Sequence, residues 1–264
     1  MNRATPTALL AAAVAVLLAI PERARAQFQP PPVPPRPASA KDAAPEDITG
    51  YWVSIVTEDW RWRMLTPAKG DYTSLPLNPE GRKAADTWDP AKDAAAGNQC
   101  KAYGAAGLMR LPTRLHVTWQ DNNTLKVETD EGTQTRLFHF GIRPPQGPAP
   151  SLQGYSAAEW DISRPTNMGF QPPPAAAGKL PGSLEVVTTS LRPGYLRKNG
   201  VPYSGNAVLT EYFTRTNEPN GDSWLILTSI VQDPQYLTSE LLTSTHYKRE
   251  ADGAKWSPSA CEAK

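Results

Sequence analysis

Short stretches of alternating apolar and polar residues, separated by turn-forming residues, constrain the fold of this chain more than any other feature. The stretch RLHVTW, residues 114–119, places Leu115 and every second residue after it on one apolar face. Turn chemistry follows at Asp121-Asn122-Asn123, and LKVET at 125–129 alternates again. A period of two is typical of a β-strand with one buried face. The sequence therefore predicts a β-hairpin at 114–129.

Similar patterns recur along the rest of the chain, whereas helix signals are few. Further strands are predicted at 133–140, 155–162, 184–189, 207–215, 223–232 and 241–249. With the start of the domain this makes about nine or ten strands. Pro79 after Asn78, and Pro90 after Asp89, each give a capping residue followed by a proline at the first helical position, so one or two short helices are predicted at 79–88 and 90–97. We expect an all-β fold, an antiparallel lipocalin-like barrel, with a β-sandwich as the alternative.

The first residues predict export. Arg3 precedes the apolar run at 8–20, which is short for a membrane span, and Ala24-Arg25-Ala26 matches the pattern that a signal peptidase reads. We therefore expect residues 1–26 to be a signal peptide and the mature protein to be periplasmic or extracellular, without membrane insertion. An uncleaved N-terminal anchor is the alternative interpretation.

After this leader, residues 27–46 are rich in proline, which favours an extended, disordered linker. The folded part is then expected at 47–264, as a single barrel-like domain. Without residues 1–26 the chain has 24 basic and 25 acidic residues. This balance argues against nucleic acid and anionic membranes as partners, and the sequence does not indicate an oligomeric state.

Two cysteines are present, Cys100 and Cys261. In an oxidising compartment an even pair predicts one disulfide. It would close a loop of about 160 residues, which the chain-entropy model values at about 5 kcal/mol. A catalytic or redox thiol is the alternative, although no CxxC spacing supports it.

The stretch TEDWRWRM at 57–64 holds two tryptophans and two arginines. Apolar residues occupy the odd positions of 51–55 and the even positions of 60–64. Within one extended segment such a change of phase needs a bulge or bend, here near 57–59. Bulges of this kind occur often beside functional sites.

Two interpretations of these tryptophans remain open. In the first, Trp60 and Trp62 fill the barrel interior and the arginines face outward. In the second, both indoles and Trp119 line a cavity, with Arg61 or Arg63 at its mouth to bind a polar or anionic group. Both can hold together, since a barrel of this size has room for one small ligand.

Metal and cofactor chemistry is not indicated. His116, His139 and His246 each lie alone in a different predicted strand, without the paired spacing typical of zinc ligands. The sequence contains no glycine-rich phosphate loop and no nucleophile motif. We therefore expect no bound metal or cofactor.

Glu211 shares a predicted strand face with Leu209 and Phe213, so its carboxylate is expected to point inward. A buried glutamate needs a partner or a raised pKa. The partners considered are Arg61, Arg63, Arg114 and Arg136. Without such a pair, Glu211 is the best general-base candidate, followed by Glu159 with His116 or His246 as its partner.

Several segments together resemble a known family. They are Cys100, GLMRLP at 107–112, GYSAAEW at 154–160, GSLEVVTT at 182–189, the run 199–215, and the run 230–250 before Cys261. The series resembles a large family of secreted proteins of soil bacteria such as acidobacteria, whose activity is not established. Gly50-Tyr51-Trp52 is also similar to the G-x-W opening of lipocalin-type barrels. The resemblance implies a secreted β fold and names no substrate.

This chain departs from the pattern of that family in an informative way. Tyr155 and Tyr203 stand where the family has histidines, whereas Glu159, Glu211 and Asp233 match. If the histidines of the family form a metal or acid–base site, this chain lacks the site in that form.

Two functions are therefore expected from the sequence. The first is an exported binding protein that holds a small, partly apolar ligand, with Trp60, Trp62, Trp119, Arg61, Arg63 and Glu211 as ligand contacts. The second is an enzyme, such as an isomerase, dehydratase or hydrolase, that acts on a small metabolite or sugar through a carboxylate base. The two are distinguished by whether a carboxylate meets a histidine or second acid in one cleft.

Overall fold

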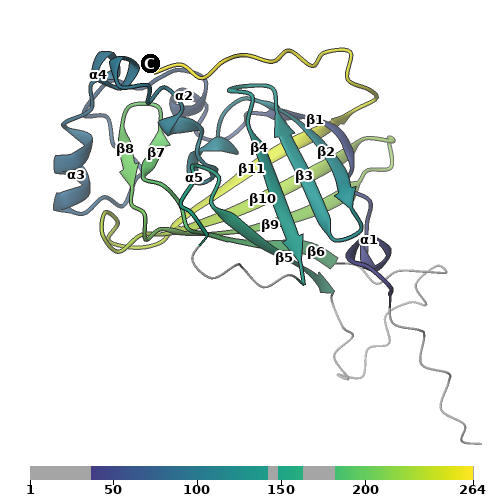
Figure 1. Cartoon of the computed structure of the whole chain (residues 1–264). Coiled ribbons are helices and arrows are strands. Elements are labelled where there is room, and N and C mark those ends of the chain that lie inside the picture. The colour runs from purple at the N-terminus through teal and green to yellow at the C-terminus, as the bar shows by residue number, and fades with distance from the viewer. Residues whose placement is uncertain (1–36, 142–147, 163–181, 264) are drawn as a thin grey trace, which may run out of the picture. The chain divides into compact units, whose positions relative to one another are not determined.

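The computed structural model describes residues 37–141, 148–162 and 182–263. The predicted leader and the first part of the predicted linker lie outside these ranges. Within them, nine strands form a closed barrel (Figure 1). In order around the barrel the strands are β1 (Gly50–Ile55), β11 (Leu241–Glu250), β10 (Ser223–Gln232), β9 (Val208–Asn217), β6 (Gly182–Thr189), β5 (Tyr155–Ile162), β4 (Thr135–Phe140), β3 (Thr124–Thr129) and β2 (Arg114–Asp121). The prediction of an all-β barrel is confirmed.

One neighbouring pair of strands departs from the antiparallel arrangement that the sequence predicted. β4 and β5 run parallel, with Phe138 opposite Ser156. Parallel neighbours need a connection long enough to carry the chain back along the barrel. β4 ends at Phe140 and β5 begins at Tyr155, so the sequence between them is long enough for such a connection.

A second layer of short elements covers one end of the barrel (Figure 1). It contains the two-stranded sheet of β7 (Gly194–Arg197) and β8 (Val201–Tyr203). Its helices are α2 (Trp60–Arg63), α3 (Pro79–Ala85), α4 (Pro90–Ala95), the 3₁₀ turn η2 (Lys101–Tyr103) and α5 (Ala105–Leu108). Both predicted helices are confirmed as α3 and α4, capped by Asn78 and Asp89. Among the described residues, no helix is long and apolar enough to cross a membrane.

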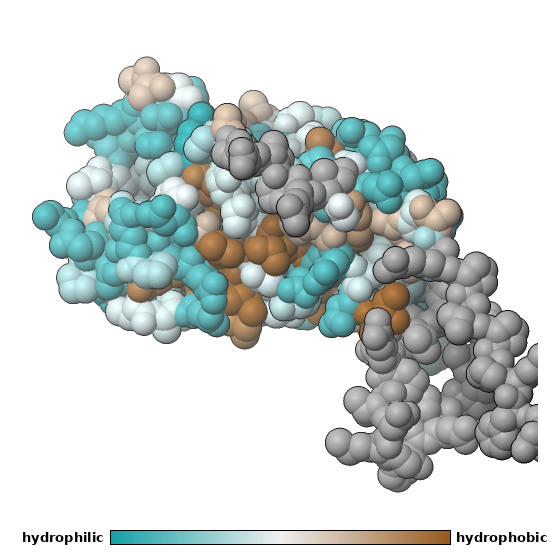
Figure 2. Space-filling model, turned by 60° about the horizontal axis from the view of Figure 1, so that its bottom comes forward, coloured by the Kyte–Doolittle hydropathy of each residue, from teal (hydrophilic) through white to brown (hydrophobic). Residues whose placement is uncertain are grey.

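The buried apolar residues form two clusters. The first fills the barrel and includes Trp52, Leu115, Phe138, Leu225 and Tyr247. The second lies where the covering layer meets the barrel, and its members are Tyr72, Leu77, Ala85, Ala105, Ala106, Leu191, Leu196, Val201, Tyr203, Ala207, Leu209, Val231 and Leu237. Figure 2 shows that the end carrying α3, β7 and β8 has a largely hydrophilic outer surface. The covering layer therefore turns its apolar side to the barrel.

One prediction about the tryptophan stretch was wrong, because the chain does not stay extended through residues 60–64. In β1 the fully buried residue is Trp52, whereas Tyr51, Val53 and Ile55 are only partly buried. The chain after β1 does not continue as a bulged strand. Asp59 adopts the left-handed conformation, with φ of 52°, and the next four residues form the helical turn α2. The alternation in 60–64 thus came from one turn of helix, because short apolar patterns cannot distinguish a helix from a strand.

Glu211 forms a buried ion pair inside the barrel. Its carboxylate accepts hydrogen bonds from Arg136 at 2.9 Å and 2.5 Å, and both side chains are fully buried. Arg136 also donates to Thr188, whose hydroxyl contacts Ser156. Arg136 is one of the partners considered from the sequence. Because both of its carboxylate oxygens accept hydrogen bonds from Arg136, Glu211 has a structural role in the barrel.

Replacement of Arg136 by methionine should strongly destabilise the protein, because Glu211 is then buried without a counterion. We expect the free energy of unfolding to fall by about 3–5 kcal/mol in urea denaturation. The double variant R136M/E211L should recover most of this loss, since an apolar pair leaves no buried charge. A double variant as unstable as R136M would contradict this account.

The segment before β1 closes the other end of the barrel, opposite the covering layer (Figure 1). The short helix α1 (Ala40–Ala43) is capped by Ser39. Main-chain N–H groups of Ala40 and Lys41 donate to Asn123 and Asn122 in the β2–β3 turn. Trp160 donates its indole N–H to the carbonyl of Ala40. Part of the predicted linker therefore packs on the barrel.

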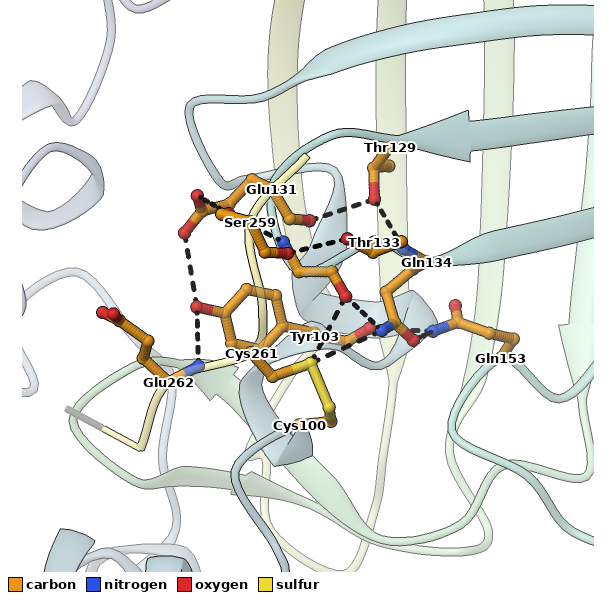
Figure 3. The surroundings of a disulfide bond; sticks show 11 residues. Cys100, Tyr103, Thr129, Glu131, Thr133, Gln134, Gln153, Ser259, Cys261 and Glu262 are labelled. Atoms are coloured by element: carbon orange, nitrogen blue, oxygen red, sulfur yellow. Dashed lines mark hydrogen bonds between the residues drawn. A yellow bond between two sulfur atoms is a disulfide. The ribbon is translucent and has the colours of Figure 1, made fainter. Parts of the chain in front are cut away.

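The predicted disulfide between Cys100 and Cys261 is confirmed. Figure 3 shows how the segment that carries Cys261 lies against the turn between β3 and β4. There Ser259 donates its hydroxyl to Glu131, and Thr133 donates to the carbonyl of Ser259. The bond joins positions 161 residues apart.

Removal of this bond should lower stability through the unfolded state, whose loop is no longer closed. With both cysteines replaced by serine, we expect the free energy of unfolding in urea to fall by up to about 5 kcal/mol. The native protein treated with a thiol reductant should show the same loss. Unchanged unfolding midpoints in both samples would exclude this contribution.

Candidate functional site

A cavity of about 190 Å³ lies where α2 and β7 meet the start of β11. We call it the arginine cavity, because it is lined by Arg63, Arg110 and Arg197. Its other lining residues are Asp59, Trp62, Ser74, Leu75, Ala106, Leu196, Val231, Leu241, Leu242 and Thr243. Its walls therefore combine three cations with an apolar surface.

Arg63 is fixed by the turn of α2. Its side chain is almost completely buried and donates to Glu58, to the carbonyl of Arg110 at 2.8 Å and to the Ser54 hydroxyl at 3.3 Å. Burial, together with the charge of Arg110, lowers the pKa of Arg63, and Glu58 opposes this effect. A guanidinium stays protonated at neutral pH despite such a shift. The Arg63 guanidinium is therefore fixed in place, and its N–H groups already have hydrogen-bond acceptors within the protein.

Arg110 links the same turn to the barrel. It donates to Asp59 at 2.5 Å and to the main-chain carbonyl of Ser244 at 2.9 Å, and it lies 3.7 Å from Glu58. Two arginines thus share two carboxylates beside the cavity. This part of the wall is close to electrically balanced.

Arg197 supplies the charge that is not balanced. Its Nη1 is buried and has no hydrogen-bond partner among the described residues. Burial lowers the pKa of Arg197, and the charges of Asp59 and Asp71 oppose this effect only in part. Arg110 and the Trp62 indole already donate to these two carboxylates. The guanidinium lies over the ring of Trp62, 5.2 Å from its centroid. A half-buried cation whose buried Nη1 has no hydrogen-bond acceptor among the described residues favours the binding of an anion.

The size of the cavity limits what it can hold. A volume of 190 Å³ corresponds to about six water molecules at liquid density, and it is below the usual range of drug-sized pockets. A wider, open groove of about 770 Å³ shares Ser74, Leu75, Leu241 and Leu242 with the arginine cavity. A small group can therefore sit among the arginines while the rest of a ligand lies in the groove.

The structure divides the predicted ligand contacts between different places. Trp62 and Arg63 both line the arginine cavity. Trp60 is 63 % exposed and Arg61 is also exposed, near Asp71. Trp119 packs at the opposite end of the barrel, against Phe140 and Trp160.

The predicted catalytic residues do not converge on one cleft. Glu211 lies in the barrel with Arg136, and Glu159 is exposed on the outside of β5. His116 stacks on Tyr51 and contacts Glu128 at 3.3 Å. His246 contacts a carboxylate that the sequence did not single out, Glu58, at 3.4 Å.

His139 stacks on Tyr155, at a centroid distance of 4.9 Å. Burial lowers the pKa of His139, which favours the neutral ring. Within 37–141, 148–162 and 182–263, no group of three or more histidine, cysteine, aspartate or glutamate side chains is arranged to hold a metal ion.

Sequence reasoning missed Arg110 and Arg197 as site residues. Arg110 lies in a loop after α5, and Arg197 is the last residue of β7, a four-residue strand that was not predicted. Neither has a periodic pattern around it. Their common place in the fold depends on the way the covering layer packs on β10 and β11, which no local signal in the sequence carries.

Comparisons of the chain with models of protein families, with curated proteins and with solved structures found no match. The resemblance to secreted proteins of soil bacteria and to the lipocalin opening therefore stays a prediction.

Glu58 should make the stability of this region depend on acid pH. Burial works against its ionisation, but hydrogen bonds from the Thr57 hydroxyl and its own main chain, with the charges of Arg63 and His246, hold its pKa below the ordinary value. The ionised form therefore stabilises the fold above the unfolded-state pKa, and this contribution is lost as pH falls through the folded-state pKa.

We expect E58Q to unfold more easily at neutral pH, by about 1–3 kcal/mol, because Arg63 loses its anionic partner. The further loss between about pH 6 and pH 3 should be smaller in E58Q than in the native protein, as measured by urea denaturation at each pH. E159Q, which alters an exposed carboxylate, is the control. Parallel pH curves for E58Q and the native protein would refute the assignment.

Proposed function

We propose that the protein is an exported barrel protein that binds a small, partly apolar anion in the arginine cavity. The observation that carries this proposal is Arg197, whose buried Nη1 lacks a hydrogen-bond partner among the described residues. A carboxylate or similar anion would supply that partner and offset the excess positive charge. Hydrogen bonds between a guanidinium and an anion are among the stronger ones in proteins.

The apolar part of the ligand follows from the rest of the wall. Leu196 and Val231 are buried and belong to the cluster beneath the covering layer, and Leu75 and Leu241 pack against it. Trp62 adds one flat ring, already ordered by its hydrogen bond to Asp71. A ligand with an anionic group beside a compact apolar group would match both surfaces.

The position of the site distinguishes this proposal from a ligand held inside the barrel. The interior contains large, fully buried side chains such as Trp52, Phe138 and Tyr247, and the buried pair of Arg136 and Glu211. The arginine cavity lies instead where the covering layer meets the barrel. The barrel then serves as the rigid support of the site.

Export is part of the proposal. The chain carries a leader-like N-terminal sequence, and the Cys100–Cys261 disulfide is of the kind that persists in oxidising compartments. Catalysis has less support, because both oxygens of Glu211 are engaged by Arg136 and neither Glu58 nor His246 lines the cavity. Binding is therefore the function that we infer.

Benzoate and its neutral analogue benzamide test the proposal. We expect calorimetric titration to detect benzoate binding that is at least about tenfold tighter than benzamide binding, because only the anion pairs with Arg197. R197Q should remove this preference. R192Q, which removes an exposed arginine five positions away, should keep it.

Thermal unfolding of each variant checks that it is folded before titration. A native preference for benzoate that persists in R197Q would overturn the role of Arg197. No binding of benzoate, acetate or phosphate by the folded native protein would overturn the proposed function.

A further inference from the structure

The strand at the closing seam of the barrel is only partly paired. β11 pairs with β10 along Leu241–Lys248, but with β1 only from His246 to Glu250. β1 ends at Ile55, and the chain then turns away at Asp59 into α2. Residues 241–245 of β11 therefore have one edge without a neighbouring strand.

The hydrogen bonds of β1 determine which residues of β11 point their main-chain groups toward this edge. The N–H of Ser54 donates to Thr113, next to β2, so Ser54 faces β2 and its neighbours Val53 and Ile55 face β11. Val53 and Ile55 are opposite Lys248 and His246. Because successive residues of a strand alternate in direction, the even-numbered residues of β11 turn their N–H and C=O groups toward the β1 side.

A hydrogen bond from Arg110 to β11 agrees with this direction. Its guanidinium donates to the carbonyl of Ser244, an even-numbered residue of β11 beyond the end of β1. The same alternation turns the N–H and C=O of Leu242 to the unpaired side. No hydrogen bond from Leu242 to a described residue outside the sheet is found. One donor and one acceptor are thus open at this position.

The open edge lies directly beside the arginine cavity. Leu241, Leu242 and Thr243 all line it, together with Arg197. Leu242 also lines the wider groove, and its side chain is 66 % exposed. Because Leu242 and Arg197 line one small cavity, neighbouring residues of an extended chain, which rises about 3.3 Å per residue, can contact both.

We propose that the ligand of this site is the carboxyl terminus of an extended peptide, which adds beside β11 as a short strand. This rests on the proposed anion binding and specifies its ligand. The terminal carboxylate pairs with Arg197, and the preceding residue exchanges main-chain hydrogen bonds with Leu242. The rest of the peptide leaves through the groove. Strand addition of this kind takes affinity from the main chain and specificity from side-chain pockets.

The walls of the arginine cavity define the last side chain of the peptide. Ala106, Leu196 and Val231 are buried apolar residues, and the small volume leaves space for a compact aliphatic group. Asp59 is held by Arg110, so it does not take the place of the carboxylate at Arg197. Peptides ending in alanine or valine fit this description.

The probe is a fluorescent tripeptide, Ala-Ala-Val, with a blocked amino end and a free carboxylate. We expect fluorescence anisotropy to show binding of the acid at least about tenfold tighter than that of the matching C-terminal amide. Methylation of the nitrogen in the middle residue should weaken binding by at least about threefold. Equal binding of acid and amide, or of methylated and plain peptides, would overturn the proposal.

The variant L242P tests the edge separately from the anion site. Proline removes the N–H that points away from β10, and prolines are tolerated on strand edges. L242P should weaken binding of the peptide at least about threefold more than it weakens binding of benzoate, because benzoate does not use the main-chain N–H of Leu242. S244A, a neighbouring substitution that keeps the main-chain groups of β11 at a residue lining neither the arginine cavity nor the groove, is the control.

The two proposals fail in different ways. Benzoate binding that depends on Arg197, with no preference for the peptide acid over its amide, would refute the peptide alone. Loss of benzoate binding in the folded native protein would refute the anion site beneath it. A dimer that L242P dissociates, in a protein that does not bind the peptide, would assign the edge to a second copy and overturn the proposal.

Discussion

The closure of the barrel rests on five residue pairs between β1 and β11. This short seam makes the sheet continuous, and it determines what happens at the covered end of the barrel. Since β1 stops at Ile55 and the chain turns at Asp59, the following residues form α2 instead of continuing as a strand beside β11. The turn delivers Trp62 and Arg63 to the arginine cavity. A β1 longer by four residues would pair with the remaining edge and fill the place of the site.

Two groups of buried or half-buried arginines in this protein have opposite roles. Arg136 is matched by Glu211 in the barrel, where a carboxylate takes two of its hydrogen bonds. Arg63 and Arg110 are likewise matched by Glu58 and Asp59, but Arg197 is added beside them without an acid of its own. Arg136 keeps one buried Nε without a hydrogen-bond partner among the described residues, but its charge is paired. An unpaired cation such as Arg197 retains the capacity to attract an anion. We infer that the paired arginines stabilise the fold, whereas Arg197 is available to bind an anion.

The sequence predicted the scaffold better than the site. The strand positions followed from alternation at Leu115, Val127 and similar residues, and the disulfide followed from an even count of cysteines. Local patterns of this kind report the face that a residue buries. The inward direction of Glu211 was also readable, because its neighbours Leu209 and Phe213 mark the face.

The site could not be read in this way, because its residues come from segments without periodicity. The pattern at 60–64 was compatible with a strand and a helical turn alike, and the left-handed Asp59 that decides between them has no reliable signature in a single sequence. Arg110 and Arg197 are brought together by packing between the covering layer and the barrel, which is a tertiary effect. Only two members of the expected binding set, Trp62 and Arg63, reach the cavity.

The disulfide has a consequence for the way the molecule opens. Every barrel strand from β2 to β11 lies between Cys100 and Cys261, and β1 alone lies outside this covalent ring. Detachment of β1 would split the cylinder lengthwise while the crosslink stays intact. The disulfide therefore does not oppose partial unfolding of β1, the strand that ends at Ile55 beside the arginine cavity. Detachment of β1 would also expose Trp52, which is fully buried in the core of the barrel.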